Sequence, residues 1–237
     1  MLNAVVMPLE NAYHGRLGDY FARTAGTSPF NAFTDRPAML ELAGDVAGLR
    51  ILDVGCGAGH YTADLLDRGA CVTGIDGSAT LLRHARERVG SRADLRLHDL
   101  DSPLNFAADA SFDAAVCALV YHHIAARDQL LTELRRVVRP GGWLVLSTTH
   151  PTAEWHHHGG SYYDGTWVDG TLADPSMAIR YQRMTLEALM NEWLSAGFTL
   201  ERLVEPRPLP QLREVDESRY DRLSQAPSFL AVRLGSP

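Results

Sequence analysis

The chain has 237 residues, of which 46% are hydrophobic and 22% charged, values typical of a folded protein and not of a disordered one. Its 29 Asp and Glu residues outnumber 22 cationic residues, and the net charge of −7 disfavours nucleic acid or an anionic membrane as the main partner. Every cation is an arginine, because the chain has no lysine, and this excludes a lysine Schiff base and a P-loop lysine.

The sequence also predicts a cytoplasmic location. Its apolar runs are of strand length, and the N-terminus lacks the basic and apolar regions of an export signal. Cys56, Cys71 and Cys117 lie far apart and lack the CxxC spacing, so we expect reduced thiols, neither a disulfide framework nor a zinc site. We expect no membrane partner, and a monomer and a homodimer both stay open.

The predicted elements begin with two helices, at residues 11–23 and 37–43. Between residues 49 and 149, β-rich runs then alternate with helical periodicity. The clearest helix is 128–139, whose leucines and valines share one face and which ends at Pro140-Gly141-Gly142. This alternation predicts an open α/β fold, a parallel sheet with helices on both faces. The predicted strands are 50–54, 71–75, 95–98, 114–119 and 143–148.

After residue 149 the pattern changes. Residues 150–176 are rich in Gly, Tyr, Trp, Asp and His and have no sustained period, so we interpret them as an insertion. A helix is predicted at 185–196, and Gly197 stands at its C-terminal end. Two further strands are predicted at 198–204 and 229–234.

The most informative segment is the glycine-rich loop after the first strand. Gly55, Gly57 and Gly59 stand at alternate positions, which lets the backbone turn tightly and a ligand approach the main chain. The spacing GxGxG departs from the GxGxxG of dinucleotide-binding proteins. Asp53 stands two residues before the first glycine, where it would repel a pyrophosphate and attract an amino group.

Two more acids follow the next two strands. Asp76 ends the second strand, where its carboxylate can accept hydrogen bonds from both hydroxyls of a ribose. Asp99 ends the third strand, where it can accept from an adenine amine. Ligands of open α/β folds bind at this carboxyl edge of the sheet, although each acid alone also fits a turn or a helix cap.

Residues 51–59, ILDVGCGAG, resemble motif I of the class I S-adenosylmethionine-dependent methyltransferases. The similarity continues through Asp76, residues 98–100, 112–116, 121–124 and 134–142. It implies a Rossmann-like, seven-stranded, mostly parallel sheet in the order 3-2-1-4-5-7-6, with strand 7 antiparallel. It also implies one methyltransferase domain, with an N-terminal helical cap (1–48), a cofactor-binding core (49–149), a lid or insertion (150–184) and a C-terminal helix with strands (185–237).

The resemblance implies that S-adenosylmethionine is the cofactor and S-adenosylhomocysteine its product. The glycine loop and Asp53 would hold the methionine part, Asp76 the ribose, and Asp99 with Leu100 the adenine. The aromatic residues near the N-terminus could close over the cofactor or simply pack. The predicted cofactor-binding residues are Asp53, Gly55, Gly57, Gly59, Asp76, Gly77, Asp99, Leu100, Ala118, Leu119 and Tyr20.

Residues 149–151, Thr-His-Pro, resemble a group of small-molecule methyltransferases common in actinobacteria. We therefore predict methyl transfer to a small molecule of secondary metabolism, with O, N and C all open as the acceptor atom. His150 is the candidate general base, because an imidazole titrates near neutrality, although it could equally bond to loop backbone. Tyr13, His123 and Tyr162 are the predicted substrate-binding residues.

The run His156–His158 invites a metal-binding interpretation. No nearby carboxylate or cysteine completes a ligand set if the segment is extended, so no metal is expected. A substrate lid, a solvated loop and an oligomer contact remain open for this run. Other functions also remain: an S-adenosylmethionine-binding enzyme of another type, such as a cyclase, or an NAD-dependent oxidoreductase, which the glycine spacing disfavours.

Overall fold

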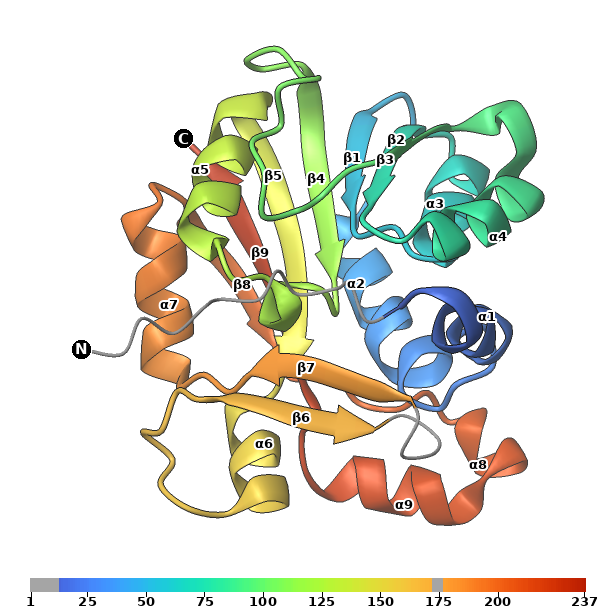
Figure 1. Cartoon of the computed structure of the whole chain (residues 1–237), viewed down its shortest axis with the longest axis vertical. Coiled ribbons are helices and arrows are strands. Elements are labelled where there is room, and N and C mark those ends of the chain that lie inside the picture. The colour runs from blue at the N-terminus through green and yellow to red at the C-terminus, as the bar shows by residue number, and fades with distance from the viewer. Residues whose placement is uncertain (1–12, 172–176) are drawn as a thin grey trace.

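A seven-stranded sheet forms the centre of the molecule (Figure 1). The computed structural model describes residues 13–171 and 177–237. The strand order is β3-β2-β1-β4-β5-β9-β8, and a separate two-stranded sheet holds β6 and β7. The strands are β1 (Arg50–Val54), β2 (Cys71–Asp76), β3 (Asp94–Leu97), β4 (Phe112–Ala118), β5 (Val138–Thr149), β6 (Trp167–Thr171), β7 (Ala178–Gln182), β8 (Thr199–Val204) and β9 (Phe229–Ser236).

The sheet confirms the predicted topology. Strands β3, β2, β1, β4 and β5 pair in parallel, whereas β9 runs antiparallel to both β5 and β8. When the separate hairpin is left out of the count, β8 is the sixth strand and β9 the seventh, which gives the order 3-2-1-4-5-7-6. Strand β5 begins at Val138, directly after α5, because its first residue pairs with Phe112 across an irregularity in β4.

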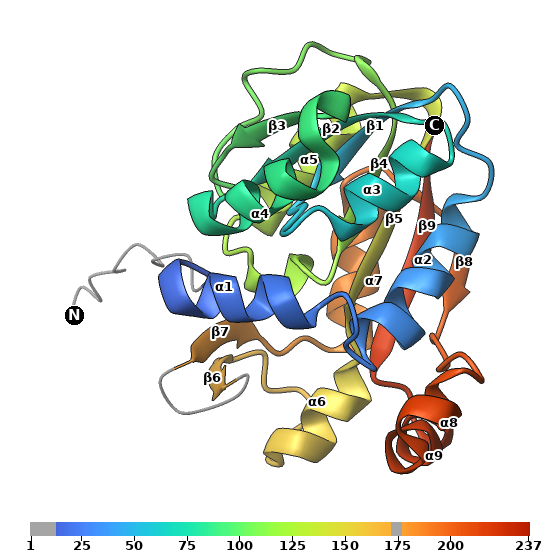
Figure 2. The same ribbon diagram turned by 90° about the vertical axis from the view of Figure 1, so that its right-hand side faces the viewer.

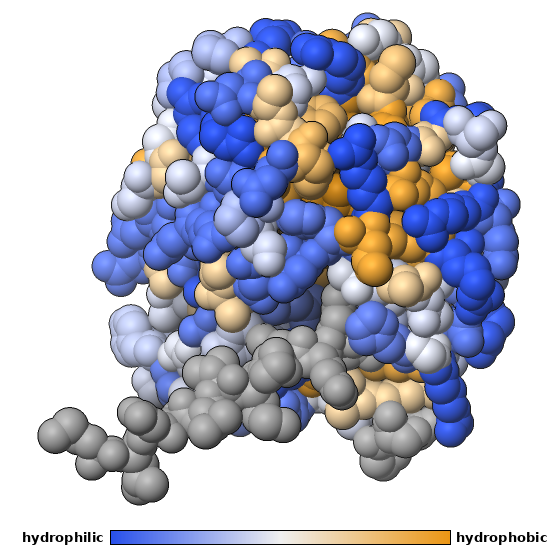
Figure 3. Space-filling view, turned by 45° about the horizontal axis from the view of Figure 1, so that its top comes forward, coloured by the Kyte–Doolittle hydropathy of each residue, from blue (hydrophilic) through white to orange (hydrophobic). Residues whose placement is uncertain are grey.

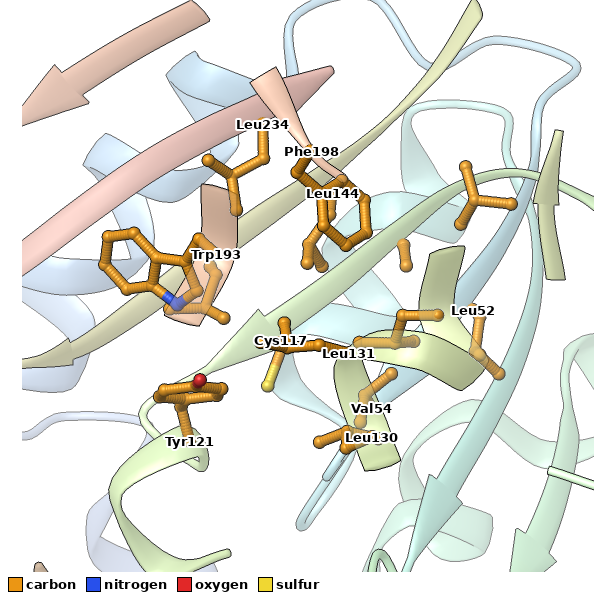
Figure 4. Close-up of a cluster of buried hydrophobic side chains, with 14 of the residues drawn as sticks. Leu52, Val54, Cys117, Tyr121, Leu130, Leu131, Leu144, Trp193, Phe198 and Leu234 are labelled. Atoms are coloured by element: carbon orange, nitrogen blue, oxygen red, sulfur yellow. The ribbon is translucent and has the colours of Figure 1, made fainter. Parts of the chain in front are cut away.

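Helices cover both faces of the sheet. Alternate residues of a strand point to opposite faces, so Leu52 faces α5 and α7, and Ile51 faces α2 and α3. Figure 4 shows the first of these cores, where Trp193 of α7 lies beside Tyr121. The helices are α1 (Gly15–Thr24), α2 (Arg36–Ala43), α3 (His60–Asp67), α4 (Ala79–Val89), α5 (Arg127–Val137), α6 (Pro151–His158), α7 (Leu186–Ser195), α8 (Leu212–Val215) and α9 (Glu217–Gln225), with short turns η1 (Asn31–Asp35), η2 (Gly90–Arg92) and η3 (Tyr121–His123).

Several elements gather beyond the carboxyl ends of the parallel strands. Helices α1 and α6 and the β6–β7 hairpin lie there (Figures 1 and 2). The segment 150–176, for which the sequence analysis predicts an insertion and names no element, contains α6 and β6. Helix α6 has only eight residues and one buried residue, and β6 pairs only with β7, so neither carries the periodic pattern of a core element.

In the part of the chain that the structure describes, no helix has both the length and the apolar character needed to cross a membrane. Hydrophilic side chains dominate the face drawn in Figure 3, where hydrophobic ones occupy a smaller area.

Candidate functional site

A cavity of about 790 Å³ opens at the carboxyl edge of the sheet. Its walls come from the glycine loop, the ends of β2, β4 and β5, and the elements that lie beyond them: α1, η1, η3, α6 and the β6–β7 hairpin. This is the position where open α/β folds bind ligands, and the volume suits a nucleotide-sized ligand together with a small second molecule.

The three glycines of the loop have different roles, although each has a positive φ. A Cβ on Gly55 would lie 2.3 Å from Cγ2 of Val120, so no side chain fits there. A Cβ on Gly59 would lie 3.1 Å from Cα of Ala85, because α3 and α4 approach closely. Gly57 has no atom nearer than 3.9 Å and lines the cavity, which a Cβ there would begin to fill.

Asp76 presents a buried carboxylate to the cavity. Its Oδ2 accepts the Gly57 N–H at 2.8 Å, and its Oδ1 accepts the Ser78 N–H at 2.7 Å. Each carboxylate oxygen has a further lone pair, so both can still accept from a pair of ligand hydroxyls. Burial raises the pKa of Asp76, and the two backbone hydrogen bonds oppose that rise.

Asp53, which the sequence analysis predicts to bind the cofactor, is not among the described residues that line the cavity. Its Oδ2 accepts the Thr62 hydroxyl at 2.6 Å, and the residue is 1% exposed. Burial raises its pKa to about 7, against the hydrogen bonds from Thr62. Asp53 therefore ties β1 to α3 beneath the loop, while Gly59 packs the same helix against α4.

The other predicted cofactor residues line the cavity, except Gly59, which packs against Ala85. Tyr20 comes from α1, Asp99 and Leu100 follow β3, and Leu119 follows β4. Leu119 has a φ of 55°, a strained backbone conformation for a residue other than glycine. Its N–H donates to both the carbonyl and the hydroxyl oxygen of Ser147. The predicted cofactor residues that line the cavity are Gly55, Gly57, Asp76, Gly77, Asp99, Leu100, Ala118, Leu119 and Tyr20.

His150 lies outside the cavity wall. Its Nδ1 bonds to Thr152, where the ring caps α6, and its Nε2 lies 3.1 Å from Oε1 of Glu205. Both ring nitrogens of His150, the general base that the sequence analysis predicts, therefore have partners that do not line the cavity. Tyr162 is likewise engaged elsewhere, because its hydroxyl accepts the Leu186 N–H at 2.9 Å.

Two neighbouring histidines reach the cavity instead. His123 donates from Nδ1 to the Arg180 carbonyl at 2.8 Å, since a carbonyl can only accept. His122 shares a hydrogen bond between Nδ1 and the Thr148 hydroxyl at 3.1 Å. Burial lowers the pKa of each imidazole, and His123 lowers that of His122 further. Both rings are therefore neutral at pH 7, and Tyr13 packs edge-on against His123.

Residues that the sequence analysis did not select complete the cavity. Asp35 ends η1, Tyr61 lies in α3 and Glu154 lies in α6, and all three line it. Asp35 immediately precedes Arg36-Pro37, the start of α2. An Asp before a Pro is a typical helix start, so this pattern predicts a helix boundary and not a residue that lines a cavity. The residues around Glu154 carried no pattern that pointed toward a cavity.

Among residues 13–171 and 177–237, no three His, Cys, Asp or Glu side chains lie close enough together to hold a metal ion. His156–His158 lie in α6 and not in an extended segment. The cysteines are free thiols in these described parts: Cys56 and Cys117 are buried and Cys71 is exposed.

The family assignment follows from comparison with known proteins. A methyltransferase domain family matches residues 52–146, from β1 to β5. A ubiquinone biosynthesis O-methyltransferase of Xanthomonas oryzae pv. oryzae is 30% identical over 165 residues, covering 64% of this chain and 68% of that relative. The chain belongs to the class I S-adenosylmethionine-dependent methyltransferases.

Solved methyltransferases share the fold of this methyltransferase. One from Mesorhizobium loti superposes with a TM-score of 0.68 at 24% identity, over 89% of this chain and 99% of its own. A 1,6-didemethyltoxoflavin-N1-methyltransferase of Burkholderia thailandensis, solved with S-adenosylhomocysteine, has a TM-score of 0.60 at 20% identity, over 92% of this chain and 86% of its own. The chain spans about half the length of some curated relatives, such as 48% of a ubiquinone biosynthesis O-methyltransferase of Dechloromonas aromatica.

Proposed function

We propose that this methyltransferase moves a methyl group from S-adenosylmethionine to a small-molecule acceptor, in secondary metabolism. The observation that carries the proposal is the buried Asp76 carboxylate, which is fixed by the Gly57 N–H and open to a cavity with room for a second molecule. When bound, S-adenosylmethionine supplies an electrophilic methyl group on a sulfonium. The chain then has to hold and align both partners and exclude water.

The proposed cofactor contacts follow the cavity wall. Asp76 would accept from the ribose hydroxyls, and Asp99 from the adenine amine, with Leu100 against the ring. Gly57 would let the methionine part approach the backbone closely. Leu119 and Ala118, at the end of β4, would border the reacting centre, and Tyr20 of α1 would cover it.

His123 is the proposed proton acceptor for an acceptor molecule that is protonated at rest. Its Nδ1–H donates to the Arg180 carbonyl, so the Nε2 of the neutral ring is the free base. Its lowered pKa keeps that ring unprotonated at neutral pH. This assigns to His123 the role that the sequence analysis gave to His150.

Calorimetry tests the proposal. We expect S-adenosylhomocysteine to bind in the micromolar range, about −8 kcal/mol, and NAD not to bind. Asp76→Asn should weaken S-adenosylhomocysteine by about 10- to 100-fold, through loss of charge-assisted hydrogen bonds. Asp109→Asn, an exposed acid outside the cavity, is the matched control. NAD binding without a response to S-adenosylhomocysteine would refute the proposal, and cofactor binding with turnover but no methyl transfer would favour a cyclase-type reaction.

The setting of the reaction belongs to the same proposal. We infer a cytoplasmic enzyme with no nucleic-acid or membrane partner, from the net charge of −7 and the unpaired thiols. A small acceptor agrees with a cavity of about 790 Å³ that a cofactor shares.

A further inference from the structure

Asp35 is a buried acid with an unpartnered oxygen on the cavity wall. The residue is 0% exposed, and its Oδ2 accepts from the Tyr61 hydroxyl, whereas its Oδ1 has no hydrogen-bond partner among residues 13–171 and 177–237. It ends the π-helical turn η1, in which the Asp35 N–H reaches back to the Phe30 carbonyl at 2.9 Å. Such turns are rare and frequently mark functional sites. A buried carboxylate oxygen without a donor is costly unless a ligand supplies one.

Glu154 of α6 repeats this arrangement on another wall. Its side chain is 13% exposed, and its Oε2 is buried and finds no hydrogen-bond partner in the part of the chain that the structure describes. His158 Nε2 lies 3.5 Å from that oxygen and bonds to the Tyr181 hydroxyl at 2.8 Å instead. Burial raises the pKa of the Tyr181 phenol, and so do the charge of the Glu154 carboxylate and a hydrogen bond to it. The turn η1 and helix α6, which both lie outside the matched residues 52–146, thus each place a carboxylate with an unpartnered oxygen on the wall of one cavity.

The position along the sheet separates these acids from the cofactor end. Asp76 ends β2. The Ser147 hydroxyl, which lowers the pKa of the Asp35 carboxyl, belongs to β5, and α6, which carries Glu154, follows β5 directly. Three strand spacings separate β2 from β5 in the order β2-β1-β4-β5. At about 4.8 Å each, they amount to ~14 Å, enough to place the ribose contact and Asp35 at different ends of the site.

The cavity as a whole is acidic. Among the described residues, five carboxylates line it, those of Asp35, Asp76, Asp99, Asp101 and Glu154, against two arginines. Arg36 pairs with Asp64 at 3.2 Å, and Arg180 lies 3.7 Å from Asp169, so neither cation is directed only at the cavity acids. Aromatic rings stand beside the carboxylates, with Phe30 edge-on to Phe229 and Tyr181 near His123. Carboxylates and ring faces together bind organic cations.

We propose that the methyl acceptor is a primary or secondary amine with an aromatic or similar apolar body, held as its ammonium ion by Asp35 and Glu154. This inference rests on the proposed function and adds the acceptor atom, nitrogen, which the sequence analysis left open. Curated relatives are named O-methyltransferases, so the inference also separates this chain from them.

The transfer step balances with the groups that line the cavity. The bound ammonium ion first gives one proton to Nε2 of His123, which frees the nitrogen lone pair. That lone pair forms the N–CH₃ bond as the bond between the methyl carbon and sulfur breaks, and the sulfur keeps the electron pair as a neutral thioether. The methylated nitrogen regains a positive charge beside the two carboxylates, and His123 releases its proton to solvent.

Binding and turnover of one matched pair test the inference. The probes are phenethylamine and 2-phenylethanol, which differ in nitrogen against oxygen, and benzyltrimethylammonium, a cation that cannot be methylated. With S-adenosylhomocysteine present, calorimetry should show phenethylamine, whose ammonium group donates hydrogen bonds, binding more tightly than benzyltrimethylammonium, which has no N–H. Phenethylamine binding should weaken about tenfold or more in Asp35→Asn and in Glu154→Gln. Glu214→Gln, an exposed acid of α8 that does not line the cavity, removes the same charge and should bind as the wild type does.

Methyl transfer from labelled S-adenosylmethionine should favour phenethylamine over 2-phenylethanol by about tenfold or more. Failure of the wild type to bind S-adenosylhomocysteine would refute the proposed function itself. Normal wild-type cofactor binding without uptake of either cation would overturn only this inference, as would faster methylation of the alcohol. Tenfold weaker S-adenosylhomocysteine binding by Asp35→Asn would assign Asp35 to the cofactor and also overturn it.

Discussion

The glycine loop allows stability and ligand binding to be separated by two neighbouring substitutions. Gly55→Ala places a Cβ 2.3 Å from Cγ2 of Val120 at a φ of +69°. The left-handed conformation costs roughly 1–2 kcal/mol for a residue with a Cβ. Overpacking against a β-branched neighbour adds about 1–3 kcal/mol, because Val120 cannot rotate away freely. We therefore expect the free energy of unfolding to fall by about 2–5 kcal/mol in all.

Gly57→Ala is the matched comparison. Its φ is +55° and its nearest neighbour would be Cε1 of Phe21 at 3.9 Å, so only the backbone cost of about 1–2 kcal/mol applies. Its Cβ enters the cavity, so this variant should lose more affinity for S-adenosylhomocysteine than stability. Urea unfolding without ligand measures the first effect and calorimetry the second.

A double-mutant cycle isolates the contact. Val120→Ala should destabilise the wild type but cost much less, or even stabilise, in the Gly55→Ala background, because it removes Cγ1 and Cγ2, the two atoms nearest to the new Cβ. Equal stability of the Gly55→Ala and Gly57→Ala proteins, or strict additivity in the cycle, would refute a steric conflict between Val120 and any side chain at position 55.

Two further outcomes are expected. Burial raises the pKa of Asp35 from 3.8 to about 6, so the folded state binds more protons than the unfolded state between those values and loses stability as the pH rises through them. The free energy of unfolding of the wild type should therefore fall by ~3 kcal/mol relative to that of Asp35→Asn between pH 4 and pH 7, as measured by urea unfolding. A stability difference between the two proteins that does not change with pH would contradict this. His150→Ala should cost about 1 kcal/mol of stability as a lost helix cap and leave methyl transfer within threefold, whereas His123→Ala should reduce transfer by about 10²-fold or more. The reverse ranking would restore His150 as the base.

Local sequence patterns were sufficient for the central sheet. Residues 50–54 form β1 as predicted, and the amphipathic helices 128–139 and 185–196 appear as α5 and α7 with small shifts at their ends. These elements bury one face or two in the core, so hydrophobic periodicity encodes them directly. The eight-residue α6 and the β6–β7 hairpin were not predicted, because few of their residues are buried. Helix α6 is stabilised by its cap, and β6 and β7 by their pairing with each other.

By itself the sequence determined the fold class and the position of the cofactor edge, because a strand that runs into GxGxG and acids at successive strand ends are local features. The strand order came from the resemblance to the methyltransferase family and not from any local pattern. Only the tertiary structure decided which polar side chains meet. In the folded chain Asp53 bonds to Thr62, and the two ring nitrogens of His150 contact Thr152 and Glu205. Asp35 and Glu154 line the same cavity, although 119 positions separate them in the chain. Side-chain direction at an edge depends on the packing of distant segments, and no spacing within one segment records that.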